Sequence, residues 1–274
     1  MKNSIKTFLK HPTKDNSNRS ANPAVIRAST ILFNTMQELY QHEKKIKKNQ
    51  KISHYSYGRY GSSTTIELEN ILKELEQAFH VFLTGTGFGG VALAIMSICR
   101  PGDEILVSDN VYGPTKEISE KLLKEFNVTA KFYNPDSFDD LKNKISKKTK
   151  MILVENPGSN TFEFQDLSRI VNLAKKKKIL TFLDNTWGTP LYLKPLKLGF
   201  DMSFSSATKY FSGHSDAMGG SLAVNKKVFK RIMFFYKLSG YRMSADEAYL
   251  IIRGLRTLDT RLNQHYENTK QVIN

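Results

Sequence analysis

The sequence predicts an α/β fold built around a mostly parallel sheet. Short apolar segments that suit buried strands alternate with amphipathic segments of helical period along most of the chain. Alternation of this kind builds a sheet through right-handed crossovers. The chain has 274 residues, 40% of them hydrophobic, which is enough to bury a large core.

The N-terminal segment lacks this alternation. Residues 1–20 are polar and without periodicity, so we expect a mobile arm there. Residues 22–33 are apolar and read as extended chain. Thr35 is predicted to cap a helix, with Glu38 three positions later completing a capping box, and this helix ends in the lysine-rich residues 44–48.

Helices and strands then follow one another. An amphipathic helix is predicted over residues 66–78, with a strand over residues 80–83 after it. The further strands are predicted at 104–108, 128–133, 150–155, 179–183, 202–205 and 221–225, and the further helices at 91–99, 115–126, 137–145, 167–177 and 258–273. Sites in such sheets gather outside the carboxyl ends of the strands.

The composition argues against several classes of partner. The formal net charge is +15, but the excess is lysine, 31 against 10 arginines, spread over helix faces without interleaved aromatic residues, so we expect no nucleic-acid partner. No apolar run approaches the roughly 20 residues of a membrane span, so no membrane partner is expected. Cys99 is the only cysteine, and no metal site is predicted. Because the start of the chain lacks the apolar core of a secretion signal, the expected location is the cytoplasm.

Residues 84–90 read TGTGFGG and join a predicted strand to a predicted helix. Gly85, Gly87 and Gly90 satisfy the G-x-G-x-x-G pattern of dinucleotide-binding turns. Asp109 lies 19 residues after Gly90, where such a unit places its ribose-binding acid. A helix N-terminus also binds other phosphates through its free N–H groups. The glycines alone therefore leave both a nicotinamide cofactor and pyridoxal phosphate open.

Residues 206–216 read SATKYFSGHSD and follow the predicted strand 202–205. Lys209 lies among hydroxyl groups, including those of Ser206 and Thr208, and the loop beyond it is broken by glycines. An ordinary strand-to-loop transition is one interpretation. The other is an amine that forms a Schiff base with pyridoxal phosphate, while the hydroxyl groups hold the phosphate beside it.

This segment closely resembles the pyridoxal-phosphate lysine signature of the transsulfuration enzymes, the Cys/Met metabolism family. The match covers eleven residues without a gap, and the resemblance extends from about Asn22 to the end of the chain. It implies the fold-type I transferase fold, pyridoxal 5′-phosphate as cofactor and Lys209 as the residue that carries it. It also favours pyridoxal phosphate over NAD at the glycine turn, where Gly87 and Phe88 are expected to donate backbone N–H groups to the phosphate.

Further site residues follow from the same resemblance. Tyr57 and Arg59 match residues that reach across a subunit interface to the neighbour's cofactor phosphate, which implies a homodimer or homotetramer with a shared site. Tyr112 matches the residue that stacks on the pyridine ring, and with Lys209 it is the expected catalytic residue. Asp184, after strand 179–183, matches the carboxylate that keeps the pyridine nitrogen protonated.

The implied activity is carbon–sulfur β-elimination on cystathionine, an amino-acid substrate, giving homocysteine, pyruvate and ammonia. The segments 184–187 and 214–218 favour the β-eliminating members over the γ-lyase and γ-synthase members, which remain alternatives together with an impaired remnant and an NAD-binding protein. The expected division is an arm and interface segment, 1–60, a cofactor-binding large domain, 61–250, and the start of a C-terminal domain, 251–274. Members of the family continue into that domain, which supplies the arginine for the substrate carboxylate, so the chain is expected to be truncated and impaired.

Overall fold

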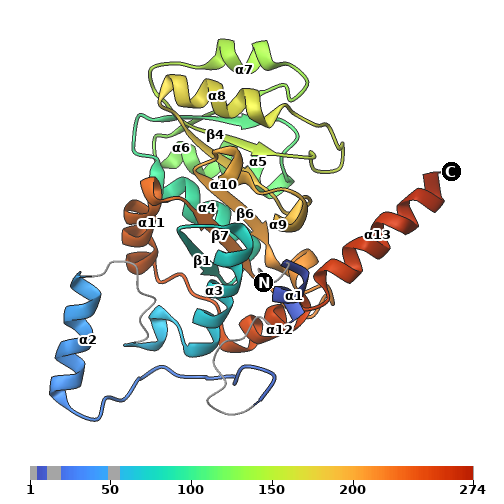
Figure 1. Ribbon diagram of the computed structural model, residues 1–274. Helices are drawn as coiled ribbons and strands as arrows, with labels where there is room; N and C mark the ends of the chain where they lie inside the picture. The colour runs from blue at the N-terminus through green and yellow to red at the C-terminus, as the bar shows by residue number, and fades with distance from the viewer. Residues whose placement is uncertain (1–4, 11–19, 49–55, 274) are drawn as a thin grey trace.

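The predicted sheet is present, and its strands are β1 His80–Thr84, β2 Glu104–Ser108, β3 Thr129–Tyr133, β4 Thr149–Glu155, β5 Leu180–Asp184, β6 Met202–Ser206 and β7 Gly220–Val224. The computed structural model describes residues 5–10, 20–48 and 56–273, and within them the seven strands form one sheet in the order β1-β7-β6-β5-β4-β2-β3. β7 is antiparallel to β1 and β6, and all other neighbours are parallel (Figure 1). The mostly parallel α/β fold is confirmed.

The helical segments are α1 Ile5–Lys10, α2 Met36–Lys48, η1 Gly58–Tyr60, α3 Ser63–Glu76, α4 Gly87–Ile98, α5 Gly113–Glu117, η2 Ile118–Leu122, α6 Leu123–Glu125, α7 Phe138–Lys144, α8 Leu167–Lys177, α9 Thr189–Tyr192, α10 Pro195–Leu198, η3 Ala207–Phe211, α11 Lys226–Ser239, α12 Ala245–Leu255 and α13 Leu258–Ile273. They cover both faces of the sheet. One apolar core joins α4, α6 and α11 to one face. On the other face, one core lies beneath α3 and α12 and a second beneath α8. The sheet is therefore buried on both sides, as its apolar strands require.

The N-terminal arm is more ordered than the sequence predicts. Residues 5–10 form α1, in which Leu9 is 1% exposed and packs into the core beneath α3 and α12. Lys6 also forms an ion pair with Asp259 of α13 at 3.2 Å. A single buried leucine anchors a short helix without producing a periodic pattern, so the prediction of a mobile arm is wrong for these residues. The remainder of the arm, residues 1–4 and 11–19, lies outside the described residues.

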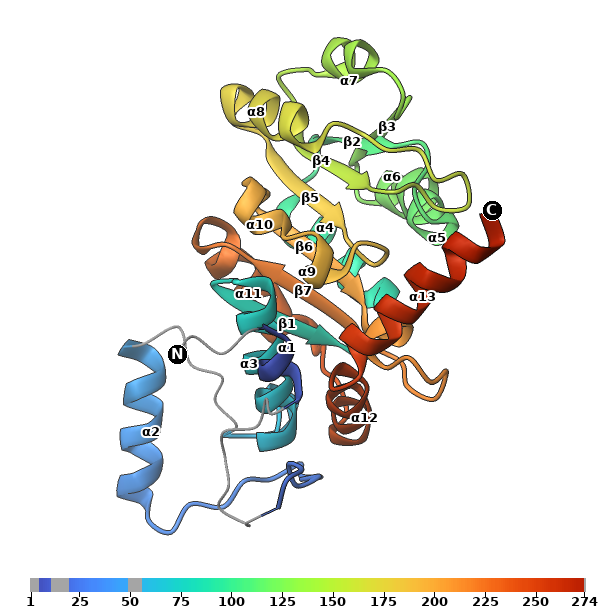
Figure 2. The same ribbon diagram turned by 45° about the vertical axis from the view of Figure 1, so that its right-hand side comes forward.

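The predicted cap of α2 is confirmed, because the Thr35 hydroxyl accepts a hydrogen bond from the N–H of Glu38 at 3.1 Å. The capping box is altered, since the Glu38 carboxylate accepts from the N–H of Asn34 at 2.9 Å and not from that of Thr35. α2 stands apart from the sheet and its helices in both views (Figures 1 and 2). Met36 and Tyr40 on this helix are each 61% exposed.

The strand order excludes a dinucleotide-binding unit at the glycine turn. Such a unit needs two neighbouring parallel strands joined by the helix that follows the glycines. Here β1 and β2 flank α4 in the sequence, but β7, β6, β5 and β4 lie between them in the sheet. Asp109, the expected ribose-binding acid, instead forms an ion pair with Lys116 at 2.6 Å. The nicotinamide interpretation of these glycines is therefore wrong.

The last helix, α13, projects from the body of the protein (Figure 2). Leu258 and Leu262 are buried in the core beneath α3 and α12, whereas Tyr266 and Ile273 are 59% and 76% exposed. The predicted apolar face is thus buried only at its start. Across the described ranges, none of the helices has the length and apolar character that a membrane span requires.

Candidate active site

The site forms where β4, β5 and β6 end. These strands are parallel, so their last residues, Glu155, Asp184 and Ser206, lie at the same edge of the sheet. Glu155 and Asp184 occupy paired positions in the register of β4 and β5. This is the edge of the sheet at which the sequence analysis expects a site.

Asp184 is a buried carboxylate with one free oxygen. It is 8% exposed, and its Oδ1 accepts hydrogen bonds from the N–H and the hydroxyl of Thr186, at 3.0 and 2.6 Å. Within residues 56–273, its Oδ2 has no hydrogen-bond partner. Burial raises the pKa of Asp184 to about 6, against the two bonds from Thr186, which lower it. The side chain is thus placed to bind a positively charged donor that none of the described residues supplies.

Thr186 connects Asp184 to β6. Its hydroxyl donates to Asp184 and accepts a hydrogen bond from the N–H of Ser206 at 2.9 Å. The sequence analysis did not identify Thr186, because a threonine two residues after a strand is common and only the fold brings it to Ser206. Its place two residues after Asp184 is the one feature of the sequence that could have indicated a role for Thr186.

The glycine turn and the lysine segment meet at Ser206. A Cβ atom built on Gly87 would lie 2.6 Å from the Ser206 Oγ atom, so the start of α4 lies directly against the end of β6. α4 begins at Gly87, earlier than predicted, with Thr86 as its cap accepting from the N–H of Gly89 at 3.0 Å. Free N–H groups at such a helix start attract phosphate. Phe88, in the same turn, is 40% exposed.

Lys209 lies in the helical turn η3 that follows β6. Its side chain is exposed, and in the described part of the chain its amine has no hydrogen-bond or ion-pair partner. Thr208, one residue earlier, is engaged elsewhere: its hydroxyl accepts from the N–H of Gly219 at 3.0 Å. Of the two hydroxyl groups expected to hold phosphate, that of Ser206 is therefore the one left without a partner among the described residues.

Tyr112 is held at the site through its backbone. Its N–H donates to Oε2 of Glu155 at 2.7 Å, while the residue as a whole is 51% exposed. Glu155 itself is 5% exposed. Burial and then the charge of Asp184 raise the pKa of Glu155 to about 8, against the Tyr112 hydrogen bond, which lowers it. Sequence analysis missed Glu155, since a glutamate that ends a strand carries no signal of its own.

Tyr57 and Arg59 do not join this cluster within the chain. The Arg59 guanidinium donates to the backbone oxygen of Lys237 at 2.7 Å and lies over the Tyr60 ring at 4.5 Å. Tyr57 is 48% exposed, forms a backbone bridge with Thr30 and accepts a hydrogen bond from the N–H of Tyr60 at 2.8 Å. Both residues are therefore exposed on the surface around η1.

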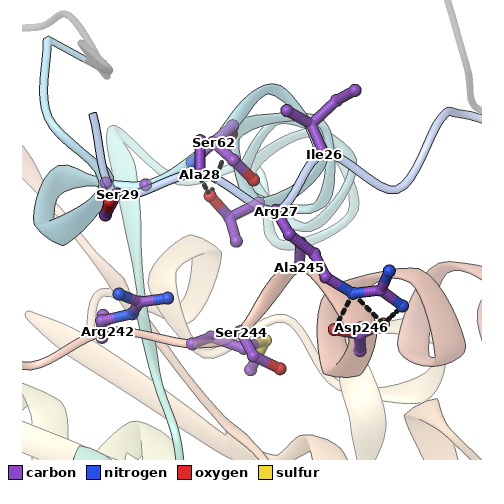
Figure 3. Close-up of a pocket in the computed structure, with 13 residues that line it drawn as sticks. Ile26, Arg27, Ala28, Ser29, Ser62, Arg242, Ser244, Ala245 and Asp246 are labelled. Carbon is purple, nitrogen blue, oxygen red and sulfur yellow. Dashed lines mark hydrogen bonds and ion pairs between the residues drawn. The ribbon is translucent and has the colours of Figure 1, made fainter. Parts of the chain in front are cut away.

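A separate cavity of about 400 Å³ lies between this η1 segment and the start of α12 (Figure 3). Arg27 and Asp246 form an ion pair at its side, with hydrogen bonds of 2.9 and 3.0 Å, and the Arg242 side chain lies at the opposite end (Figure 3). None of the predicted site residues is among those that line it. The cavity is therefore distinct from the cluster around Asp184 and Lys209.

An aromatic row lies beside η3, and sequence analysis missed it. The Trp187 ring lies 5.1 Å from the Phe162 ring and 6.3 Å from the Tyr210 ring, measured between centroids. Tyr210, next to Lys209, in turn meets His265 of α13 at 5.9 Å. These contacts tie the loop after Asp184 to η3 and to α13.

Comparison with known proteins shows which family the chain belongs to. The sequence profile described as "Cys/Met metabolism PLP-dependent enzyme" matches residues 6–274. A protein of Bordetella avium named cystathionine beta-lyase is 33% identical over 274 residues, covering 98% of this chain. A protein of Wolbachia pipientis named L-alanine/L-glutamate racemase is 34% identical over 258 residues, covering 92% of this chain.

A solved structure shows the same fold. The cystathionine gamma synthase of Xanthomonas oryzae, in complex with aminoacrylate and cysteine, superposes with a TM-score of 0.90 at 27% identity over 99% of this chain. The chain spans about two thirds of the length of these proteins: 68% of the Bordetella protein, 64% of the Wolbachia protein and 68% of the Xanthomonas protein.

Proposed function

Because the chain belongs to the family of Cys/Met metabolism PLP-dependent enzymes, we propose that it is a carbon–sulfur lyase that cleaves cystathionine by β-elimination. The observation that carries this proposal is the group formed by Asp184, Ser206 and Lys209 at the ends of β5 and β6, beside the start of α4. Similarity to the cystathionine beta-lyase of Bordetella avium supports the choice of substrate.

Pyridoxal phosphate fits the groups present. Lys209 would hold it through its unpartnered amine, and the free Oδ2 of Asp184 would accept a hydrogen bond from the pyridine nitrogen. The Ser206 hydroxyl and the N–H groups of Gly87 and Phe88 would hold the phosphate. The raised pKa of Asp184 supports this assignment. Burial disfavours the ionised form of this carboxyl group, and a protonated ring nitrogen beside it would stabilise that form.

The chain's own residues would then act as follows. Bound at this site, the cofactor supplies an electron sink for negative charge at the substrate's Cα. The Lys209 amine, released when the amine of the substrate takes its place, would accept the Cα proton. The Cβ–S bond breaks, and the sulfur leaves with the bonding electrons and takes up a proton as homocysteine. Addition of water to the remaining fragment releases pyruvate and ammonia. Asp184 would keep the pyridine nitrogen protonated, and Tyr112 would stack on the ring.

We also propose that two or more copies of the chain associate, with Tyr57 and Arg59 serving the site of a neighbouring copy. Support comes from their exposure and from the absence, among residues 56–273, of any contact between them and Asp184, Ser206 or Lys209. A guanidinium suits this role because it can hold two phosphate oxygens at once.

The test is a product assay with cystathionine. Pyruvate and homocysteine in equal amounts, abolished by Lys209→Ala, are the expected result, with Lys226→Ala on the surface of α11 as the matched control. Borohydride reduction followed by peptide mapping should place the pyridoxyl label on Lys209. Cysteine and 2-oxobutyrate as products would indicate γ-elimination instead. D-Alanine formed from L-alanine, with no cleavage of cystathionine, would favour the activity named for the Wolbachia protein.

A further inference from the structure

Glu155 connects two expected cofactor contacts that are far apart in the sequence. It is the last residue of β4 and pairs in register with Asp184, the last residue of β5. Residues paired in neighbouring parallel strands direct their side chains to the same face of the sheet. The two carboxyl groups therefore share one buried environment, with exposed fractions of only 5% and 8%.

The Glu155 carboxyl also fixes the backbone of Tyr112. Its Oε2 accepts the N–H of Tyr112 at 2.7 Å, at the point where the chain enters α5. Tyr112 is 51% exposed, so packing alone constrains this residue little. The hydrogen bond to Glu155 thus fixes the position of the Tyr112 backbone, and through it the region that the Tyr112 ring can reach.

Two neighbouring buried carboxyl groups do not both ionise readily. The pKa of Asp184 is raised to about 6 and that of Glu155 to about 8, because both are buried and the charge of Asp184 acts on Glu155. Among the described residues, Asp184 is the titratable group whose charge acts on Glu155. Near neutral pH the single negative charge of the pair therefore lies mainly on Asp184, while Glu155 keeps its proton.

We propose that Glu155 is a positioning residue of the cofactor site: as a neutral carboxylic acid it fixes the backbone of Tyr112 and leaves the one buried negative charge of the pair on Asp184. The proposal rests on the proposed function only for the identity of the cofactor. It assigns Glu155 no contact with the cofactor or the substrate.

Glu155→Gln and Glu155→Met separate the two parts of this role. Glutamine is neutral and retains an oxygen that accepts the Tyr112 N–H, whereas methionine is neutral and has no such oxygen. Glu76→Gln is the matched control, because Glu76 is also fully buried with a pKa raised to about 8, but lies at the end of α3, hydrogen-bonded to Ser203.

The measurements are the dissociation constant of pyridoxal phosphate at pH 7, by absorbance titration, and the exchange rate of the Tyr112 amide proton, by NMR on the full chain with and without cofactor. Glu155→Met should weaken cofactor binding by about tenfold or more and speed amide exchange by a similar factor, as the loss of a buried hydrogen bond implies. Glu155→Gln should restore both to within about threefold of the native values, and Glu76→Gln should change neither.

Two outcomes would overturn the proposal. Weakening of cofactor binding by Glu155→Gln as severe as that by Glu155→Met, at an unchanged melting temperature, would show that Glu155 acts as a charged group. Native amide exchange in Glu155→Met would show that Glu155 does not hold Tyr112. Neither measurement uses cystathionine, so a chain that binds the cofactor in this pattern but does not cleave cystathionine would contradict the proposed function alone.

Discussion

Gly87 and Ser206 lie so close that a Cβ atom on Gly87 would stand 2.6 Å from the Ser206 Oγ atom and 3.2 Å from its Cβ atom. The two residues are far apart in the sequence and come from the two motifs that sequence analysis singled out. Their contact places the first N–H groups of α4 beside the Ser206 hydroxyl, which has no hydrogen-bond partner among the described residues.

Gly87→Ala should therefore weaken the binding of pyridoxal phosphate. Either the Ser206 side chain or the first turn of α4 must shift, which disturbs the donors to the phosphate. The loss of one good hydrogen bond corresponds to about tenfold in the dissociation constant. Absorbance titration measures it, and Gly113→Ala is the matched control, because a Cβ atom there meets nothing within 4 Å. Equal affinities of the two variants for pyridoxal phosphate would contradict the placement of the phosphate between the start of α4 and Ser206.

Thr186→Val should raise the pKa of Asp184 above its native value. The variant removes the hydroxyl hydrogen bond to Oδ1, the larger of the two effects that lower that pKa, and keeps the bond from the backbone N–H, so burial, which raises the pKa, is less opposed. A change of one pKa unit corresponds to about 1.4 kcal/mol, so an upward shift of at least about one unit is expected. The ¹³C shift of the Asp184 carboxyl, titrated in the cofactor-free chain, reports it. Thr186→Ser keeps the hydroxyl and should leave the titration close to native.

The order of helices and strands along the chain could be predicted because each element depends on a local sequence pattern. The apolar strands and the amphipathic helices each appear as short periodic patterns, and β2, β4 and β5 were predicted to within one or two residues. The strand order could not be predicted. That β7 inserts between β1 and β6 depends on pairing between residues such as Phe82 and Leu222, which no local pattern encodes.

The candidate site could be predicted in part for the same reason. Lys209 and Gly87 stand in motifs that each leave two interpretations open, and their assignment, like that of Asp184, follows from the resemblance of their segments to the family. Glu155 and Thr186 acquire a role only through the register of β4 with β5 and through the hydrogen bond to Ser206. Residues that act through their neighbours remain hidden until those neighbours are known.

Arg59 is predicted to serve the site of a neighbouring copy. Arg59→Ala and Lys209→Ala should each lose normal cofactor binding, since one lacks the phosphate partner and the other the amine. Mixed after joint refolding, they should regenerate native sites in about a quarter of the total, as random pairing into two-fold dimers requires. Absorbance of the bound cofactor measures the recovery. Arg27→Ala, which removes an exposed arginine paired with Asp246, should bind normally without mixing. No recovery in the mixture would place Arg59 outside the neighbour's site.

The cofactor-free chain should lose stability as the pH rises from about 6.5 to 8. In this window Glu155 and Glu76 keep their protons in the folded state, where burial raises the pKa of each to about 8, whereas in the unfolded state they are already ionised, near pKa 4.5. The folded state then binds more protons, so stability falls with pH, by at most about 1.4 kcal/mol per pH unit for each such group. The pKa of His80, lowered to about 4 by burial, acts in the opposite direction but only below its unfolded value of 6.5.

Urea unfolding at several pH values measures this slope. Glu155→Gln and Glu76→Gln should each remove part of it, and the double variant most of it. Glu163→Gln is the control, because hydrogen bonds lower the pKa of this surface carboxylate, so it is ionised throughout the window in both states. If Glu155→Gln leaves the slope of stability against pH unchanged, Glu155 is already ionised at neutral pH. That result would contradict the proposal that Glu155 is a neutral carboxylic acid beside Asp184.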